Sequence, residues 1–344
     1  MENLKYHYLN KKIVEVKMKE KVKSESKKVE ERREEVLAKG RKFKYPLQYA
    51  KHKLVFNTII IAFFALVLLV GAGYFALYKV QNTGDMLYRL TQVIPVEVAK
   101  IDGEKVKYSD YLMIYRSSLK TVEQQSGRLG DDEDARAVKN EYKRTALNNV
   151  EEYAYAQKIA NEKGITVSEE EINKEFDTHR KVGGIERSEE SFLKILEDNF
   201  GMSKSEYKHM LGLSLIRSKV MVEIDDNAKN IDKRVQQMLN ENGGDMTVVA
   251  VELGDKIEYE ETGGLVDSMN VDGGRATMAM SLEPGQISER FLSSNGDGFY
   301  YVKLISKSED KVNYASIKIP FTKFNDQIKQ LRDDGKVDEY IALE

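Results

Sequence analysis

Side chains able to carry out chemistry are few in this sequence of 344 residues. It has no cysteine, which excludes a thiolate site and a disulfide framework. Of its four histidines, only His179 and His209 lie beyond residue 78. The motifs HExxH, GxxxxGK(S/T) and GxSxG do not occur, and no group of His, Asp and Glu has the spacing of metal ligands. We therefore expect no metal and no other cofactor.

The C-terminal third has the most distinctive residue pattern. ETGGLVDSM (261–269) is rich in glycine, and SLEPGQIS (281–288) contains the turn dipeptide Pro284-Gly285. GFYYVKLISK (298–307) and YASIKIPF (314–321) have the aromatic and β-branched content of strands. The remaining apolar spacing predicts a strand or another buried run at MTVVAVEL (246–253), and helices at 228–240, 324–331 and 337–343.

Residues 96–225 have a helical pattern that follows a short hairpin. VEVAKIDGEKV (96–106) alternates apolar and polar residues around Asp102-Gly103, which predicts two strands and a two-residue turn. Ser168 with Glu171, and Ser203 with Glu206, have the spacing of capping boxes and so start two helices. Apolar residues at helical spacing predict further helices at 108–123, 134–163 and 191–200.

This order of elements resembles the N-terminal chaperone domain of the SurA, PpiD and PrsA family of exported folding factors. The stretches GITVSEEEI (164–172) and FGMSKSEYKHML (200–211) carry the resemblance, which covers about residues 96–225. It implies an all-helical domain whose broad apolar faces offer a groove to extended, unfolded segments. Any single apolar residue here is also typical of a core, so the sequence identifies no client-contacting residue.

The C-terminal third resembles the parvulin-type (PpiC) peptidyl-prolyl isomerase domain, the usual companion of a SurA-like domain. Three motifs of the family correspond to stretches of this chain. The L-x-P-G-E-I-S turn corresponds to 281–288, the G-Y-H-I-I-K-V strand to 298–307 and the G-G-D-L-G loop to 261–269. The family's strand histidine falls on Tyr300, and its aspartate falls on Leu265. The family's first strand, which has its own histidine, is missing before Ala228. YASIKIPF could replace that strand from the C-terminal side, in a permuted arrangement.

The parvulin resemblance implies four candidate site residues. Tyr300 stands in place of the catalytic histidine, and Met280, Phe291 and Phe299 fall on positions of the proline-binding pocket. A parvulin breaks no bond; it lowers a barrier of about 18–20 kcal/mol by binding proline and favouring the twisted amide. Without the histidines and the aspartate, a binding module with weak or absent isomerisation is expected. All four side chains are also typical of an ordinary core.

An uncharged apolar segment separates two regions of opposite charge. Leu54 to Tyr78 forms a run of 25 residues, long enough for a transmembrane helix. Residues 1–53 hold 17 Lys and Arg against 8 Asp and Glu, whereas residues 79–344 hold 37 against 49. The positive-inside rule therefore predicts a cytoplasmic tail and an extracytoplasmic body. The alternatives are a buried core helix and a cleaved signal peptide. The apolar run is longer than is usual for a core helix, and the charged region before it is longer than that of a signal peptide.

The charged tail at 11–44 consists almost entirely of Lys, Glu, Arg and Val and cannot bury a core. It is expected to form a solvated helix with i,i+4 ion pairs or to remain disordered. The basic stretch Lys39–Lys53 would attract anionic lipid, at about 1 kcal/mol per basic residue near the surface. The alternative is a tail that only sets topology.

Together these patterns predict an α+β protein with five segments. They are a basic cytoplasmic tail at 1–53, a transmembrane helix at 54–78, a stalk at 79–95, a SurA-like helical domain at 96–225 and a degenerate parvulin-like domain at 226–344. The expected function is a membrane-anchored extracytoplasmic chaperone for unfolded or nascent exported polypeptides. An active prolyl isomerase and a structural subunit of an envelope complex are the alternatives. The acidic body argues against nucleic acid as a partner.

Overall fold

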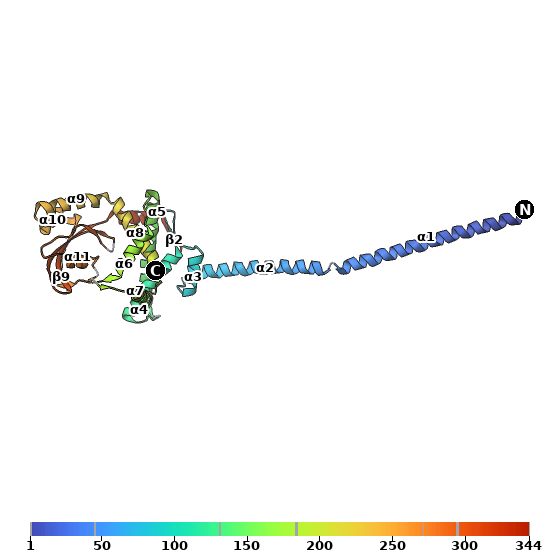
Figure 1. The fold of residues 1–344 in the computed structure, drawn as a ribbon, viewed down its shortest axis with the longest axis horizontal. Coiled ribbons are helices and arrows are strands. Elements are labelled where there is room, and N and C mark those ends of the chain that lie inside the picture. Colours follow the sequence, from blue (N-terminus) through green and yellow to red (C-terminus); the bar gives the residue numbers. More distant parts are fainter. Residues whose placement is uncertain are drawn as a thin grey trace. The chain divides into compact units, whose positions relative to one another are not determined.

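The computed structural model of the chain describes residues 2–44, 46–130, 132–182, 185–270, 272–293 and 296–343 (Figure 1). The chain divides into two compact units, residues 1–75 and residues 76–344. Helices account for most of the chain up to residue 253, and most of the strand residues follow it. The α+β class expected from the sequence is therefore confirmed.

The first unit consists of the helices α1 (Glu2–Lys44) and α2 (Pro46–Tyr74). α1 contains the charged tail, so of the two expectations for that tail the structure shows the helix. The stretch Lys53–Lys79 is long and apolar enough to cross a membrane, and its most apolar window has no buried residue. A core helix of a soluble domain has most of its apolar side chains covered, unlike this window.

The expected stalk at 79–95 is instead folded into the second unit. A π-helical turn, η1 (Phe75–Lys79), leads to α3 (Asp85–Val93). Leu77, Tyr88 and Thr91 are buried, and the Tyr108 hydroxyl donates a hydrogen bond of 2.7 Å to the Leu77 carbonyl oxygen. The segment packs on the body because it has apolar and aromatic side chains to bury, which a polar linker would lack.

The predicted hairpin is confirmed and gains a third strand. β1 (Glu97–Ile101) and β2 (Glu104–Lys107) pair around Asp102 and Gly103, whose φ angles of 47° and 82° are those of a type I′ turn. β10 (Val337–Glu339) pairs with the other side of β1, which gives the order β10-β1-β2.

The helix expected at 337–343 is therefore wrong. Gly335, with φ of 65°, lets the chain turn after α12 (Lys323–Asp333), as a glycine past a helix end commonly does. The chain then meets the free edge of β1, where the ladder hydrogen bonds outweigh the weak stability of a seven-residue helix.

The rest of the helical part follows the sequence prediction closely. Both capping boxes are formed, at Ser168 with Glu171 and at Ser203 with Glu206. Gly164 and Gly201 adopt the left-handed conformation that ends the helices before them. The elements are α4 (Tyr108–Ser126), α5 (Glu133–Lys163), α6 (Glu169–His179), β3 (Lys181–Val182), β4 (Ile185–Glu186), α7 (Glu189–Ile195), η2 (Leu196–Phe200) and α8 (Lys204–Ile224).

The sheet part follows, and both of its predicted long strands are present. The predicted strand at 298–307 coincides with β8, and β9 contains most of the predicted strand at 314–321. The elements are α9 (Asp226–Glu241), α10 (Met246–Leu253), η3 (Gly254–Lys256), β5 (Glu258–Glu261), β6 (Val266–Asp267), α11 (Arg275–Met280), β7 (Phe291–Leu292), β8 (Gly298–Lys307) and β9 (Lys311–Pro320).

The strand considered for MTVVAVEL at 246–253 is wrong, because this run is the helix α10. The Asp245 side chain caps it by accepting hydrogen bonds from the backbone N–H groups of Thr247 and Val248. Met246 and Val249 point into the core at a helical spacing of three, whereas Val251 is exposed. A local cap and one buried face therefore outweigh the β-branched composition.

Two layers of helices enclose the antiparallel sheet β5-β9-β8-β7, in which β6 also pairs with β9. Alternate residues of β8 face opposite sides. Phe299 and Tyr301 belong to the core cluster that includes Val235 of α9 and Val249 of α10. Val302 and Leu304 pack with the α11 side in a separate cluster, and the labels α9, α10 and α11 in Figure 1 show this arrangement.

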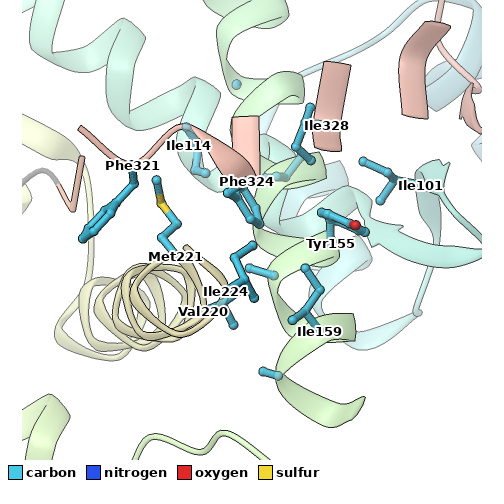
Figure 2. Packing of buried hydrophobic residues seen from close by; sticks show 14 of the residues in the cluster. Ile101, Ile114, Tyr155, Ile159, Val220, Met221, Ile224, Phe321, Phe324 and Ile328 are labelled. Atoms are coloured by element: carbon cyan, nitrogen blue, oxygen red, sulfur yellow. The ribbon is translucent and has the colours of Figure 1, made fainter. Parts of the chain in front are cut away.

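The boundary expected between residues 225 and 226 cuts through one continuous core. Figure 2 shows Tyr155 of α5, Met221 of α8 and Phe324 of α12 packed together. The C-terminal segment after β9 thus returns to the helical part, where α12 contacts α8 and β10 extends the hairpin. The two parts share the second unit and are not separately folded bodies.

Candidate functional site

An apolar groove of about 280 Å3 opens on the helical part. Its walls come from three helices, because α5 and α6 both pack against α8. The apolar wall residues are Val150, Tyr153, Ala154, Ile172, Leu213 and Ile216. Most of these side chains are only half-buried, so apolar surface remains available to a ligand.

The groove has its shape because Gly212 lies in the middle of α8. A Cβ at this position would stand 3.2 Å from Cδ1 of Ile172 on α6, closer than most real contacts. The missing side chain therefore lets α6 approach α8 and brings Ile172 into the wall. An isolated glycine inside a helical pattern often marks such close packing, so Gly212 was a signal that could have indicated this position, but the prediction from the sequence did not use it.

One rim of the groove is polar and follows the edge strand β2. Glu104, Lys105 and Lys107 of β2 line it, and β2 has a strand neighbour only on the β1 side among the described residues. On the same rim, Nε2 of His209 lies 3.0 Å from Oδ1 of Asp110. His209 also lines a second pocket, of about 440 Å3, so it stands between the two.

The second pocket lies between α3, α4 and α8. The Tyr88 hydroxyl donates to Glu206, the residue that also completes the capping box of α8. Burial would raise the pKa of Glu206, but hydrogen bonds from Ser203 and Tyr88 hold it below its ordinary value. The carboxylate is therefore charged at neutral pH and fixes α3 to the start of α8. Pro95, Val96 and Met113 supply the apolar part of this pocket.

On the sheet part, the structure brings together three of the four candidate site residues. Phe291 and Tyr300 are cross-strand partners whose rings stack with centroids 5.9 Å apart. Met280 and Phe291 both pack on the apolar cluster between α11 and the sheet. Phe299 lies on the opposite face, where its ring meets Phe321 at 4.8 Å. Strand alternation thus separates Phe299 from the other three.

Charged groups surround Tyr300. Its hydroxyl lies 3.4 Å from Oδ2 of Asp297, and Nζ of Lys318 lies 3.1 Å from the same oxygen. The Arg275 guanidinium stands 5.5 Å from the centre of the Tyr300 ring and also pairs with Glu260. Burial and the Asp297 charge raise the pKa of Tyr300 to about 12, so its phenol is protonated at neutral pH.

This arrangement can donate a hydrogen bond, but it is closed to a ligand in the described structure. Tyr300 is only 4% exposed, and Lys318 is held between Asp297 and Glu258. Ser293 and Lys318 keep the pKa of Asp297 below its ordinary value, although burial would raise it. Among the described residues, no three His, Asp or Glu side chains come together as metal ligands would.

A hollow of about 970 Å3 lies on the α9 side of the sheet part. Asp232 is buried there and accepts hydrogen bonds from the Tyr301 hydroxyl (2.6 Å) and from Arg290 (3.0 Å). The Arg290 guanidinium covers the Phe299 ring at 4.4 Å. Of the candidate residues, Phe299 is thus the one nearest to this hollow, but a paired cation covers it.

Comparison with known proteins gives the helical part a family. No curated protein matches the chain. A family described as the SurA-like N-terminal domain matches residues 46–221, which include the hairpin, α3 and the helices that line the groove. SurA-like domains bind unfolded polypeptides, so the match supports a chaperone-type role. Because it covers just over half of the 344 residues, the chain belongs to the family of proteins with a SurA-like N-terminal domain.

Proposed function

We propose that the protein is a membrane-anchored extracytoplasmic chaperone that holds unfolded segments of exported proteins in the groove of its helical part. The observation that carries the proposal is the half-exposed apolar wall between α5, α6 and α8, within the residues that match the family. A concave apolar surface with a few polar groups at its rim is typical of a binding site. An unfolded segment offers the apolar side chains that this wall would cover.

The anchor in this proposal is the apolar run at 54–78. Its length supports a single crossing of the bilayer, and the absence of buried residues in its most apolar window supports a lipid environment. Lys51 and Lys53 on one side belong to a tail with a large excess of basic residues. By the positive-inside rule, residues 1–53 lie in the cytoplasm and residues 79–344 outside it.

An extended client suits the groove better than a folded one. The strand β2 runs along the rim, and an edge strand presents backbone N–H and C=O groups that a further strand can pair with. Every second side chain of such a client would then face the apolar wall. Lys105 and Lys107 would limit self-association of this edge, as charged residues on edge strands commonly do.

The sheet part, in this proposal, is a degenerate and permuted parvulin-like domain. YASIKIPF lies within β9, next to β8, where it would serve as the replacement strand. Tyr300 in place of the histidine is protonated and buried, and Leu265 in place of the aspartate is half-exposed. These differences support weak or absent isomerisation.

The proposal is tested with the full chain in nanodiscs and a labelled, permanently unfolded polypeptide. The change is Leu213→Glu, which puts a charge on the apolar wall. We expect binding to weaken about tenfold, since losing about 1.4 kcal/mol of binding energy has that effect. Fluorescence anisotropy of the polypeptide measures it.

The matched control is Val251→Glu, the same change of charge at an exposed apolar residue of α10 outside the groove. It should bind as the parent does. Equal affinity of all three proteins would refute the groove as the client site. The alternative of a structural subunit is tested by purification after gentle solubilisation. It requires that one stoichiometric partner co-purifies, in place of many clients.

A further inference from the structure

The outer face of α3 is an exposed apolar stripe. Met86 is 83% exposed, Val93 is 82% exposed, and Leu90 and Ile94 are exposed between and beside them. The spacing of four and three residues places Met86, Leu90 and Val93 on one side of the helix, and Ile94 follows directly after its last residue. Isolated apolar residues on a surface are ordinary, but a stripe on one helix face calls for a partner.

The stripe is not needed to hold α3 in place. The opposite side of the helix already packs on the body, through buried Tyr88 and Thr91. The Tyr88 hydroxyl bonds to Glu206 and its ring contacts the Arg116 guanidinium at 4.8 Å. α3 is therefore fixed by one face, and its second apolar face remains open.

The chain reaches α3 directly after its apolar run. That run ends at Lys79, and α3 begins at Asp85, so the connection is at most about 20 Å long even when fully extended. The connection is also fixed to the body. Leu77 is buried and its carbonyl accepts from Tyr108, while the Tyr78 hydroxyl donates to the Glu97 carbonyl.

We infer that the stripe Met86, Leu90, Val93 and Ile94 lies in the outer surface of the lipid bilayer. The inference rests on the proposed anchor, because a bilayer is within reach of α3 only if residues 54–78 span it. Apolar faces of such helices enter the boundary between headgroups and acyl chains by about 5–10 Å. Arg89 beside the stripe is exposed and would remain at the headgroups. The body would then be held against the membrane by two contacts, which fixes its orientation.

The absence of tryptophan in the sequence makes a direct test possible. We would place one tryptophan at a time in the full chain, by Val93→Trp or Met86→Trp on the stripe. Leu66→Trp lies in the apolar run and reports whether the anchor is in the bilayer. The control is Val251→Trp, because Val251 is about as exposed as Val93 and lies far from α3 in the sequence. Nanodiscs of phosphatidylcholine and phosphatidylglycerol are prepared with and without brominated acyl chains, which quench only tryptophans at the bilayer.

For a tryptophan at position 93 or 86 we expect blue-shifted emission and about a twofold loss of intensity with brominated lipid, as for side chains inserted at the acyl boundary. The control should show neither. Quenching at position 66 without quenching at 93 and 86 would overturn the inference and leave the anchor intact. No quenching at position 66 would refute the anchor itself. Blue-shifted emission that brominated lipid does not quench would mean that protein, a client or a second copy, covers the stripe instead.

Discussion

The helical part and the sheet part differ in how far the apolar side chains of their candidate sites are exposed. In the helical part, Tyr153, Leu213 and Ile216 line an open groove and remain half-exposed. In the sheet part, Phe299 and Tyr300 are almost completely covered. Of the four candidate residues of the sheet part, Phe299 and Tyr300 are thus closed, whereas Met280 and Phe291 are only partly buried.

The two parts also differ in where their charged side chains lie. Around Tyr300, Lys318 joins Asp297 to Glu258, and Arg275 pairs with Glu260. A ligand at this face would have to displace paired ions. The groove of the helical part has its charges on the rim and leaves its wall apolar. The helical part therefore suits ligand binding, whereas the sheet part, as described, suits stability.

The two parts are nevertheless joined at one buried residue. Asp225 lies where the chain passes from α8 to α9 and is almost fully buried. One of its oxygens accepts from the Ala228 N–H at the start of α9, and the other from the Thr322 and Lys323 N–H groups at the start of α12. The side chain thus caps one helix of the sheet part and one helix that returns to the helical part.

The largest predicted effect concerns α12, in the C-terminal segment that packs on the helical part. Phe324→Ala removes a fully buried ring that packs on Tyr155, with centroids 5.7 Å apart. We expect the free energy of unfolding to fall by about 3–5 kcal/mol, the usual cost of such a cavity. Hydrogen exchange should show the loss in α5 and α8 as well as in α12. Phe200→Ala, at a ring that is 36% exposed, is the control and should lower the free energy of unfolding much less. Loss of protection confined to residues beyond 320 would contradict a shared core.

The sequence predicted this architecture well where the signals are local. The capping boxes, the Asp102-Gly103 turn and β8 each follow from a few neighbouring residues, and each is present. Two of the failures are non-local. β10 forms because the edge of β1, far away in the chain, is free, and α3 packs because α4 and α8 offer it a surface. Leu213 and Ile216 could not be told from core residues, since half-exposure depends on how closely α6 approaches α8.

A smaller effect is expected from Glu151, which links α5 to the returning segment. It is fully buried, pairs with Arg332 at 2.7 Å, and has one oxygen without a hydrogen-bond partner. Burial raises its pKa to about 7, although Arg332 opposes the change. The folded protein therefore holds a proton that the unfolded chain releases from about pH 4.5 upward. The free energy of unfolding should fall as the pH rises from about 4.5 to 7, by up to about 3 kcal/mol.

Glu151→Gln should remove this contribution, because the amide does not titrate and can still accept from Arg332. Denaturant titrations of the parent and the variant at several pH values measure the difference between their curves. Glu152→Gln is the control, since Glu152 pairs with Arg217 instead. Parallel curves for the parent and Glu151→Gln would show that Glu151 is charged throughout this range.

The smallest effect is predicted for Tyr300, which stands at the histidine position of the proposed parvulin resemblance. Tyr300→Phe removes a hydroxyl whose distances to the Asp297 oxygens, 3.4 and 3.5 Å, are too long for a strong hydrogen bond. The stack on Phe291 stays. We expect the free energy of unfolding to change by less than about 1 kcal/mol. In a protease-coupled proline-peptide assay, the variant and the parent should have the same rate, because a side chain that is 4% exposed cannot reach a proline ring. A parent rate above the uncatalysed one that Tyr300→Phe abolishes would instead make the sheet part an active isomerase and reverse the contrast between the two parts.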